Sequence, residues 1–259
     1  MRKNDDSRPD PISFREKLIG FIKKLQKSDG GFSVTPALRA TSALYTDYAL
    51  DALSYLHAAD EVDTAHIKSY LSALKGADGG FRFDGNMKDS SLQATYYAVH
   101  DLFLIGALDV VDKPATIAFI KKYEKKDAGG FSFAPVAGEP DIKSTYMAVY
   151  TLKTLGLLDE ATKRNAVRFL LSTPYVGMPT AYEVTQKLED ACYAIMALKL
   201  LGAERSINKK RLEAFINSFY ISANGGFAPL RGYGAAPDPT YFGLRCLVEL
   251  GALKMANIQ

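Results

Sequence analysis

The sequence predicts an all-α fold: an α/α toroid, in the form of a barrel or a horseshoe, built from about five helical hairpin repeats. A Gly-Gly-Phe motif recurs along the chain, and its phenylalanines are Phe32, Phe81, Phe131 and Phe227. A polar helical pattern precedes each motif and an apolar helical pattern follows it. No strand-like alternation of useful length is present, and 259 residues suffice for one large core.

The spacing of the motif sets the length of the repeat. Phe32 and Phe81 are 49 residues apart, Phe81 and Phe131 are 50 apart, and the 96 residues from Phe131 to Phe227 equal two steps of 48. We therefore expect a fifth, degenerate copy of the motif at residues 173–179. The predicted organisation is a polar N-terminal tail at 1–13 and a single toroid domain at 14–259, with repeat units near 14–60, 61–109, 110–159, 160–203 and 204–253.

The first helix of each repeat is expected to lie outside and the second inside. Apolar residues before the first motif recur at three-to-four spacing, which predicts an amphipathic helix with one buried face: Phe14, Leu18, Phe21, Ile22 and Leu25. Residues 42–59 carry only Asp47 and Asp51 as charges, which predicts a helix covered on all sides.

The third repeat shows the same contrast. Residues 113–126 hold six charged side chains, whereas residues 144–158 hold only Lys153. We expect a glycine of each Gly-Gly pair, with φ > 0, to end the first helix. The phenylalanine that follows should fill the gap between neighbouring hairpins.

Composition narrows the class of protein. The N-terminal segment lacks an apolar stretch of signal-peptide length, and nowhere do about 18 apolar residues run together, so we expect a cytoplasmic protein with no transmembrane segment. A formal net charge of +3 and no long basic run argue against a nucleic acid partner. Cys192 and Cys246 are too few for a disulfide scaffold. A homo-oligomer or a partner chain that covers an open edge is left open.

Polar residues in the first turns of the second helices differ between repeats that are otherwise alike. Equivalent positions, aligned on the apolar segment that follows, are Asp47, Tyr96, Tyr146, Cys192 and Tyr241. Three residues earlier are Leu44, Gln93, Lys143, Glu189 and Asp238, and five earlier are Ser42, Ser91, Asp141, Lys187 and Ala236. Divergence at one rim of a ring-shaped scaffold is typical of a specific site.

The chemistry of this rim favours an anion above an apolar cavity. All second helices should direct their N-termini, which carry partial positive charge, at the same opening, where Lys143 and Lys187 add two full charges. The apolar residues deeper in these helices would accept a long isoprenoid or acyl chain. The alternative is a toroid whose axis is packed with its own Tyr, Leu and Met side chains.

Two segments resemble a known family. The Gly-Gly-Phe repeats and Gly-Glu-Pro-Asp-Ile-Lys-Ser-Thr-Tyr-Met-Ala-Val at 138–149 are similar to the β-subunits of protein prenyltransferases, within the prenyltransferase and squalene-cyclase repeat superfamily. The likeness covers residues 14–253 at the level of repeats, and its detailed motifs lie in the third repeat and part of the fourth. Lys143 stands where the family has an arginine, which keeps the charge and loses the bidentate fork.

The resemblance implies a zinc cofactor. The segment 187–193 is similar to one that supplies two zinc ligands, which places Asp190 and Cys192 at the metal and Lys187 beside a diphosphate. In the family the metal activates a substrate thiolate that displaces diphosphate. The third ligand in the family is a histidine in a late inner helix. This chain has no matching histidine, because His57, His66 and His100 all lie in the first two repeats.

We therefore expect an enzyme that binds an isoprenoid diphosphate and transfers the prenyl group. Asp190 and Glu189 are the catalytic candidates; the substrate-binding candidates are Lys143, Lys187, Asp141, Tyr146, Gln93, Tyr96, Tyr193, Asp238 and Tyr241. One alternative is a class II terpene cyclase, in which a carboxylic acid among Glu189, Asp190, Asp47 and Asp51 protonates the substrate. The other is a non-catalytic toroid that binds an isoprenoid or lipid.

Overall fold

The computed structural model describes residues 11–136, 138–173, 188–223, 225–230 and 232–253. These residues form ten α-helices, three 3-10 helices and four two-residue strands. The chain divides into two compact units, residues 1–119 and 120–259. The first helix begins at Pro11, within the segment assigned above to the tail. No helix of the described residues has the length and apolar character needed to cross a membrane.

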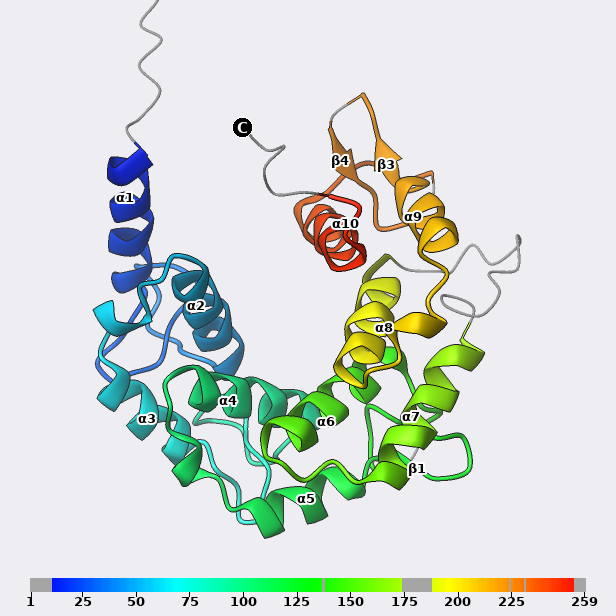
Figure 1. Cartoon of the computed structure of the whole chain (residues 1–259). Coiled ribbons are helices and arrows are strands. Elements are labelled where there is room, and N and C mark those ends of the chain that lie inside the picture. The colour runs from blue at the N-terminus through cyan, green and yellow to red at the C-terminus, as the bar shows by residue number, and fades with distance from the viewer. Residues whose placement is uncertain (1–10, 137, 174–187, 224, 231, 254–259) are drawn as a thin grey trace, which may run out of the picture. The chain divides into compact units, whose positions relative to one another are not determined.

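The first unit pairs long helices with short connections. Its α-helices are α1 (Pro11–Lys23), α2 (Ala43–Tyr55), α3 (Thr64–Ala73), α4 (Leu92–Leu104) and most of α5 (Lys113–Lys121), and its 3-10 helices are η1 (Ala59–Glu61) and η2 (Leu108–Val110). Helix α2 packs against α4, while α1 packs on α2 and α3 on α4 (Figure 1).

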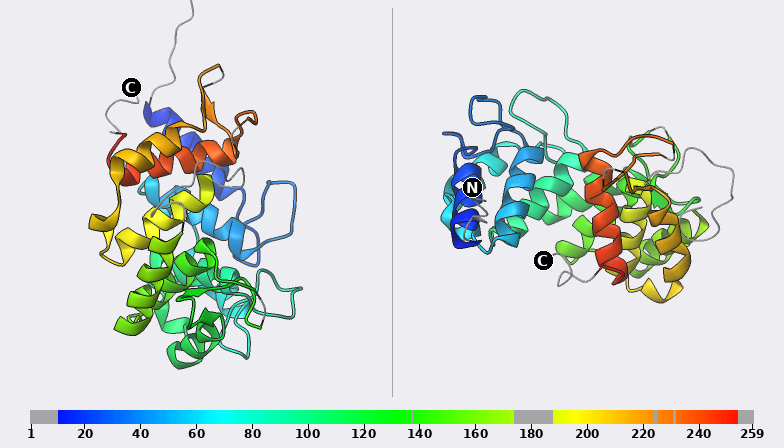
Figure 2. Two further views of the ribbon diagram at one scale, coloured as in Figure 1. Left: turned by 90° about the vertical axis from the view of Figure 1, so that its right-hand side faces the viewer. Right: turned by 90° about the horizontal axis from the view of Figure 1, so that it is seen from above.

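The second unit contains a row of three helices. Its elements are β1 (Glu124–Lys125), β2 (Gly130–Phe131), α6 (Ile142–Thr154), α7 (Glu160–Ser172), α8 (Leu188–Leu200), η3 (Glu204–Ser206), α9 (Lys209–Asn217), β3 (Tyr220–Ile221), β4 (Gly226–Phe227) and α10 (Pro237–Leu250). Helix α8 lies between α6 and α10, and α7 and α9 pack on one side of this row (Figures 1 and 2). Strand β1 pairs with β2 and β3 with β4, both antiparallel.

Burial separates the two kinds of helix in the second unit. Helix α6 buries nine of its 13 residues, whereas α7 buries three of 13. Helices α2, α4 and α6 begin with polar caps, because the side chains of Ser42, Ser91 and Asp141 each accept the backbone N–H three residues on. Helix α10 follows Ala236, which provides no side-chain cap. Several of the even-numbered helices are followed by a glycine in the left-handed conformation, as at Gly156 and Gly251, with φ of 73° and 71°.

The Gly-Gly pair has a different role from the one expected. Helix α3 ends at Ala73, so Gly79 lies in a turn well beyond it and does not end the helix. Gly79 has φ of +89°, and a Cβ added there would lie 2.4 Å from the backbone of Ala115. Gly80 lies against the ring of Phe119 in the same way. Both glycines are needed because the turn packs directly on the next odd-numbered helix.

The phenylalanine of the motif is anchored by a threonine. Phe131 is fully buried, and its backbone N–H donates to Thr145 Oγ1 at 2.9 Å. The threonine hydroxyl in turn donates to Asp141 O at 2.7 Å. The same arrangement links Phe32 to Thr46, Phe81 to Thr95 and Phe227 to Thr240. Each anchor fixes the turn against the first part of the following even-numbered helix.

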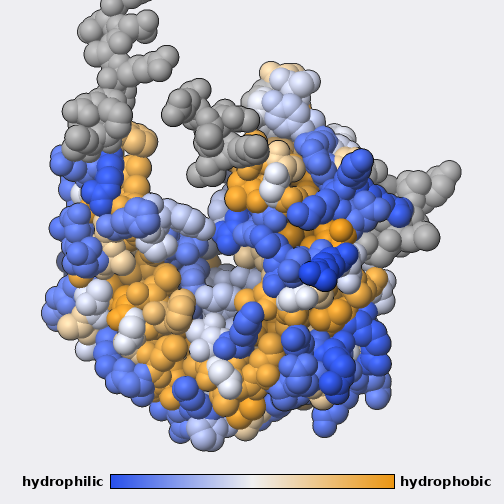
Figure 3. Space-filling view, viewed as in Figure 1, coloured by the Kyte–Doolittle hydropathy of each residue, from blue (hydrophilic) through white to orange (hydrophobic). Residues whose placement is uncertain are grey.

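Two expectations about the first unit were wrong. Phe14, Leu18 and Phe21 were expected on the buried face of α1, but they are 54%, 36% and 51% exposed. The buried face is formed by Ile19 and Ile22. Figure 3 shows apolar side chains along α1. The spacing alone did not identify the face, because apolar residues occur on both sides of this helix. Helix α2 is not covered on all sides, since it exposes two tyrosines, Tyr48 and Tyr55.

Candidate functional site

Aromatic rings form a continuous row across α6, α8 and α10. Tyr146 on α6 lies 5.3 Å from Tyr193 on α8, measured between ring centroids, and 5.9 Å from Tyr150 on its own helix. Tyr193 lies 5.7 Å from Phe242 on α10, and Phe242 lies 5.2 Å from Tyr241. Tyr146 is buried and Tyr241 is half exposed, so the row runs from the interior of the unit to its surface.

A lysine and a glutamate lie beside this row. Lys143 Nζ is 3.0 Å from Glu189 Oε1 and 5.6 Å from the ring centroid of Tyr193. The two charged side chains are 37% and 34% exposed, so their attraction is weakened by solvent. The structure therefore brings together four predicted site residues: Lys143, Glu189, Tyr146 and Tyr193.

The N-terminus of α6 is already met by a carboxylate. Asp141 Oδ1 accepts the backbone N–H of Ser144 at 2.7 Å, as the N-cap of the helix. This negative charge opposes the partial positive charge of the helix end, and Lys143 is paired with Glu189. The electropositive character expected at this helix start is therefore reduced. The role of Asp141 as a substrate ligand remains a prediction.

The residues of α8 do not provide a zinc site within the part of the chain that the structure describes. Cys192 is fully buried, and its Sγ contacts Met196 Sδ at 3.9 Å, whereas Asp190, two residues earlier on the helix, is partly exposed. Burial, followed by the Cys192 thiol, raises the pKa of Cys246 far above its ordinary value, which disfavours a thiolate there. No described histidine, cysteine or acid joins Asp190 and Cys192 as a third ligand. We derive no catalytic step through zinc.

The remaining predicted residues are dispersed. Asp238 is exposed in the first turn of α10, and the hydroxyl of Tyr241 accepts from Arg245 Nη1 at 3.3 Å. Gln93 and Tyr96 belong to α4 in the first unit, where Gln93 Nε2 donates to the Tyr97 hydroxyl at 3.0 Å and the Tyr96 ring stacks on His100. Lys187 and all but the first residue of the predicted fifth motif at 173–179 lie outside the described residues.

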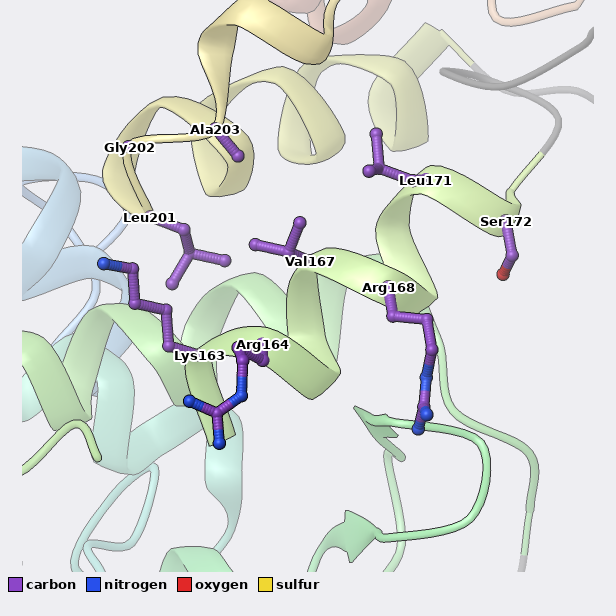
Figure 4. Close-up of a pocket in the computed structure, with 9 residues that line it drawn as sticks. All are labelled: Lys163, Arg164, Val167, Arg168, Leu171, Ser172, Leu201, Gly202 and Ala203. Atoms are coloured by element: carbon purple, nitrogen blue, oxygen red, sulfur yellow. The ribbon is translucent and has the colours of Figure 1, made fainter. Parts of the chain in front are cut away.

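Two features were not predicted from the sequence. His100 and Asp101 on α4 lie beside Asp47 of α2, and the available signal was an adjacent histidine and aspartate within an otherwise apolar helix. A pocket of about 640 Å³ lies between α7 and the turn after α8, and its apolar lining includes Val167, Leu171 and Leu201 (Figure 4). None of the predicted site residues lines this pocket.

Comparisons with known proteins bear on the fold. The model of the prenyltransferase alpha-alpha toroid domain family matches residues 6–258. Candida albicans protein geranylgeranyltransferase-I complexed with GGPP is similar in structure, with a TM-score of 0.77 and 17% identity over 95% of this chain and 79% of that chain. No curated protein sequence gives a significant match. The predicted all-α toroid and the resemblance to prenyltransferases are thereby confirmed, and the chain belongs to the prenyltransferase alpha-alpha toroid domain family.

Proposed function

We propose that this protein binds an isoprenoid diphosphate on the row of helices α6, α8 and α10. The observation that carries the proposal is the aromatic row beside Lys143. Its rings offer a continuous apolar surface to a prenyl chain, and its exposed end at Tyr241 gives access from solvent. Membership of the family supports this choice of ligand, as does the similar fungal enzyme, whose structure contains GGPP.

Lys143 is the proposed diphosphate ligand. In the free protein its partner is Glu189, and an ion pair of this exposure contributes only about 0.2–1 kcal/mol. A diphosphate with two or more negative charges would therefore displace Glu189 at little cost. The cation–π contact with Tyr193 keeps the ammonium group next to the proposed chain-binding surface.

Prenyl transfer is the reaction proposed for this site. Loss of diphosphate from an allylic carbon requires positive charge at the leaving oxygens, and Lys143 supplies one such charge. Glu189 and Asp190 would then lie near the reacting carbon. The cyclase alternative needs a carboxylic acid that is free to donate a proton to the substrate, and Glu189 is engaged in an ion pair with Lys143.

Binding without catalysis is the second candidate function. The observation that favours it is the burial of Cys192, whose thiol contacts Met196 and Cys246. Among the described residues, no third metal ligand joins Asp190 and Cys192. Turnover separates the two candidates. Release of pyrophosphate from geranylgeranyl or farnesyl diphosphate in the presence of cysteine-containing peptides supports transfer, and tight binding without release supports the binding protein.

Calorimetric titration with geranylgeranyl diphosphate tests the binding site. Lys143→Gln removes one charge-assisted hydrogen bond, worth about 1.5–3 kcal/mol, and should weaken binding by roughly 10-fold to 150-fold. Lys153→Gln is the matched control, because Lys153 lies on the same helix and donates to Leu200 O at its other end. Tyr193→Ala should weaken the binding of both geranylgeraniol and its diphosphate, whereas Lys143→Gln should weaken the binding of the diphosphate alone. Equal affinities for the two lysine variants would contradict the assignment of Lys143.

A further inference from the structure

Four ionisable side chains of α2 and α4 meet in the first unit. Asp47 and Asp51 are one turn apart on α2, and His100 and Asp101 are adjacent on α4. His100 Nδ1 lies 2.7 Å from Asp47 Oδ1, and His100 Nε2 lies 3.9 Å from Asp51 Oδ1. One potential ligand atom from each of Asp47, His100 and Asp101 lies within 4.8 Å of the other two.

Asp101 has no partner that accounts for its position. Its relative exposure is 0%, and neither carboxylate oxygen has a hydrogen-bond partner. An ionised carboxylate here is strongly unfavourable without a cation, and a protonated one still leaves its polar atoms unpaired. The side chain needs a group that the four residues alone do not provide.

Packing between helices does not require an acid at this position. The first residues of α2, α4, α6, α8 and α10 align with one another, and in this register the residues equivalent to Asp101 are Ala52, Thr151, Ala197 and Cys246. All four are small and uncharged, and three of them are buried. At this position α4 therefore carries an acid, where the other four helices carry a small neutral side chain.

We propose that Asp47, His100 and Asp101 bind a divalent transition-metal ion, with Zn²⁺ as the representative ion. One imidazole and two carboxylates are a donor set suited to Zn²⁺, and Mg²⁺ or Ca²⁺ would prefer oxygen ligands alone. The ion would replace the hydrogen bond between His100 Nδ1 and Asp47 Oδ1, so these atoms would separate from 2.7 Å to the ~3.3 Å expected across a tetrahedral zinc centre.

The surroundings of these ligands support the assignment. The ring of Tyr96 stacks on His100 with centroids 6.0 Å apart and planes 9° apart, which holds the imidazole in place. Asp51 lies on the Nε2 side of His100, where it would accept the second ring proton directly or through water, as carboxylates do beside metal-bound histidines. The Asp51 side chain is 32% exposed, against 8% for Asp47 and 13% for His100, and gives the ion a path from solvent.

Metal content of the full chain tests the proposal. The protein is stripped with a chelator, titrated with ZnCl₂ or CoCl₂, and its metal is counted after removal of free ions. We expect one ion per chain and, with Co²⁺, visible absorption bands of an ion bound by nitrogen and oxygen. Asp101→Thr, which introduces the residue of the equivalent position on α6, should lower the affinity for Zn²⁺ at least 100-fold, because even outer ligands of metal sites contribute 10- to 100-fold.

Controls separate this site from others in the chain. His66→Ala removes the exposed histidine that pairs with Asp63, and Cys192→Ser removes the thiol of α8; both should leave the zinc content unchanged. The melting temperature of chelated Asp101→Thr should equal or exceed that of the chelated wild type, since the variant loses a buried unpaired acid and remains folded. Wild-type protein that retains no more zinc than Asp101→Thr overturns the proposal. Zinc that is lost with Cys192 and kept without Asp101 also overturns it.

Discussion

Thr145→Val tests whether the threonine hydroxyl anchors the Gly-Gly-Phe turn. Thr145 is fully buried, and its hydroxyl accepts the backbone N–H of Phe131 at 2.9 Å. Valine has nearly the same shape and cannot accept a hydrogen bond, so the N–H of Phe131 would remain buried and unpaired. The cost of such a group is about 1–3 kcal/mol. For a chain of this size, each kcal/mol lowers the melting temperature by roughly 2–4 °C.

Hydrogen exchange at the Phe131 amide separates the hydrogen bond from simple packing. Thr145→Ser keeps the acceptor and removes one buried methyl group, which costs about 1 kcal/mol. Both variants should therefore be less stable, but only Thr145→Val should lose protection at the Phe131 amide beyond the change in global stability. Urea unfolding supplies that global value. Unchanged protection at Phe131 in Thr145→Val, or equal loss in both variants, would refute the anchoring role of the hydroxyl.

Three further outcomes follow from individual side chains. The hydrogen bond from the backbone N–H of Thr162 is the largest of the contacts that lower the pKa of Asp159 to about 2. Asp159 therefore stabilises the fold above its unfolded pKa of about 3.9, and this stabilisation is lost as the pH falls toward 2. Asp159→Ala should lower the free energy of unfolding, measured with urea, by about 1 kcal/mol at pH 7 and by less at pH 2–3. Gly79→Ala should lower the melting temperature strongly, because the added Cβ meets backbone at 2.4 Å, whereas Gly85→Ala, with nothing within 4 Å, should change it little; similar values would contradict the packing argument. The buried Cys246 thiol, whose pKa is raised, should react with a thiol reagent only as fast as the protein opens, and fast labelling under native conditions would contradict its burial.

Much of the fold could be predicted because hydrophobic patterning and packing agree in this chain. The apolar segment at 144–158 contains most of α6, which is largely buried, and the charged segment at 113–126 contains α5, which buries only three of its nine residues. Phe131 is buried as expected. The role of the Gly-Gly pair could not be derived in the same way. A glycine with φ > 0 suits both a helix end and a tight turn, and only the approach of the next helix, seen at Gly79, distinguishes them.

The Gly-Gly-Phe motif and its threonine are also linked in the sequence. Thr145 is four residues into the segment that begins at Asp141, and the corresponding residue of α8 is Ala191. This is the helix whose preceding segment lacks an intact Gly-Gly-Phe motif. Because a threonine without the phenylalanine amide has no anchoring role, its absence from α8 is the expected consequence. The link strengthens the case that Thr145 is kept for this hydrogen bond.

The candidate sites depend on which positions of neighbouring helices are equivalent. Lys143 and Glu189 occupy the same position on α6 and α8, so their opposite charges meet, and the sequence alignment of the helices already contained this pairing. Asp51 and His100 are equivalent in the same way on α2 and α4. The alignment placed Lys143 and Glu189 at equivalent positions, but Lys143 was assigned to an anion and His100 was left unassigned. Reading equivalent positions across neighbouring helices would have predicted both contacts, because side chains at the same height on adjacent parallel helices face the same interface. The burial of Asp101 without a hydrogen-bond partner could be seen only in the structure, because it depends on how the helices pack.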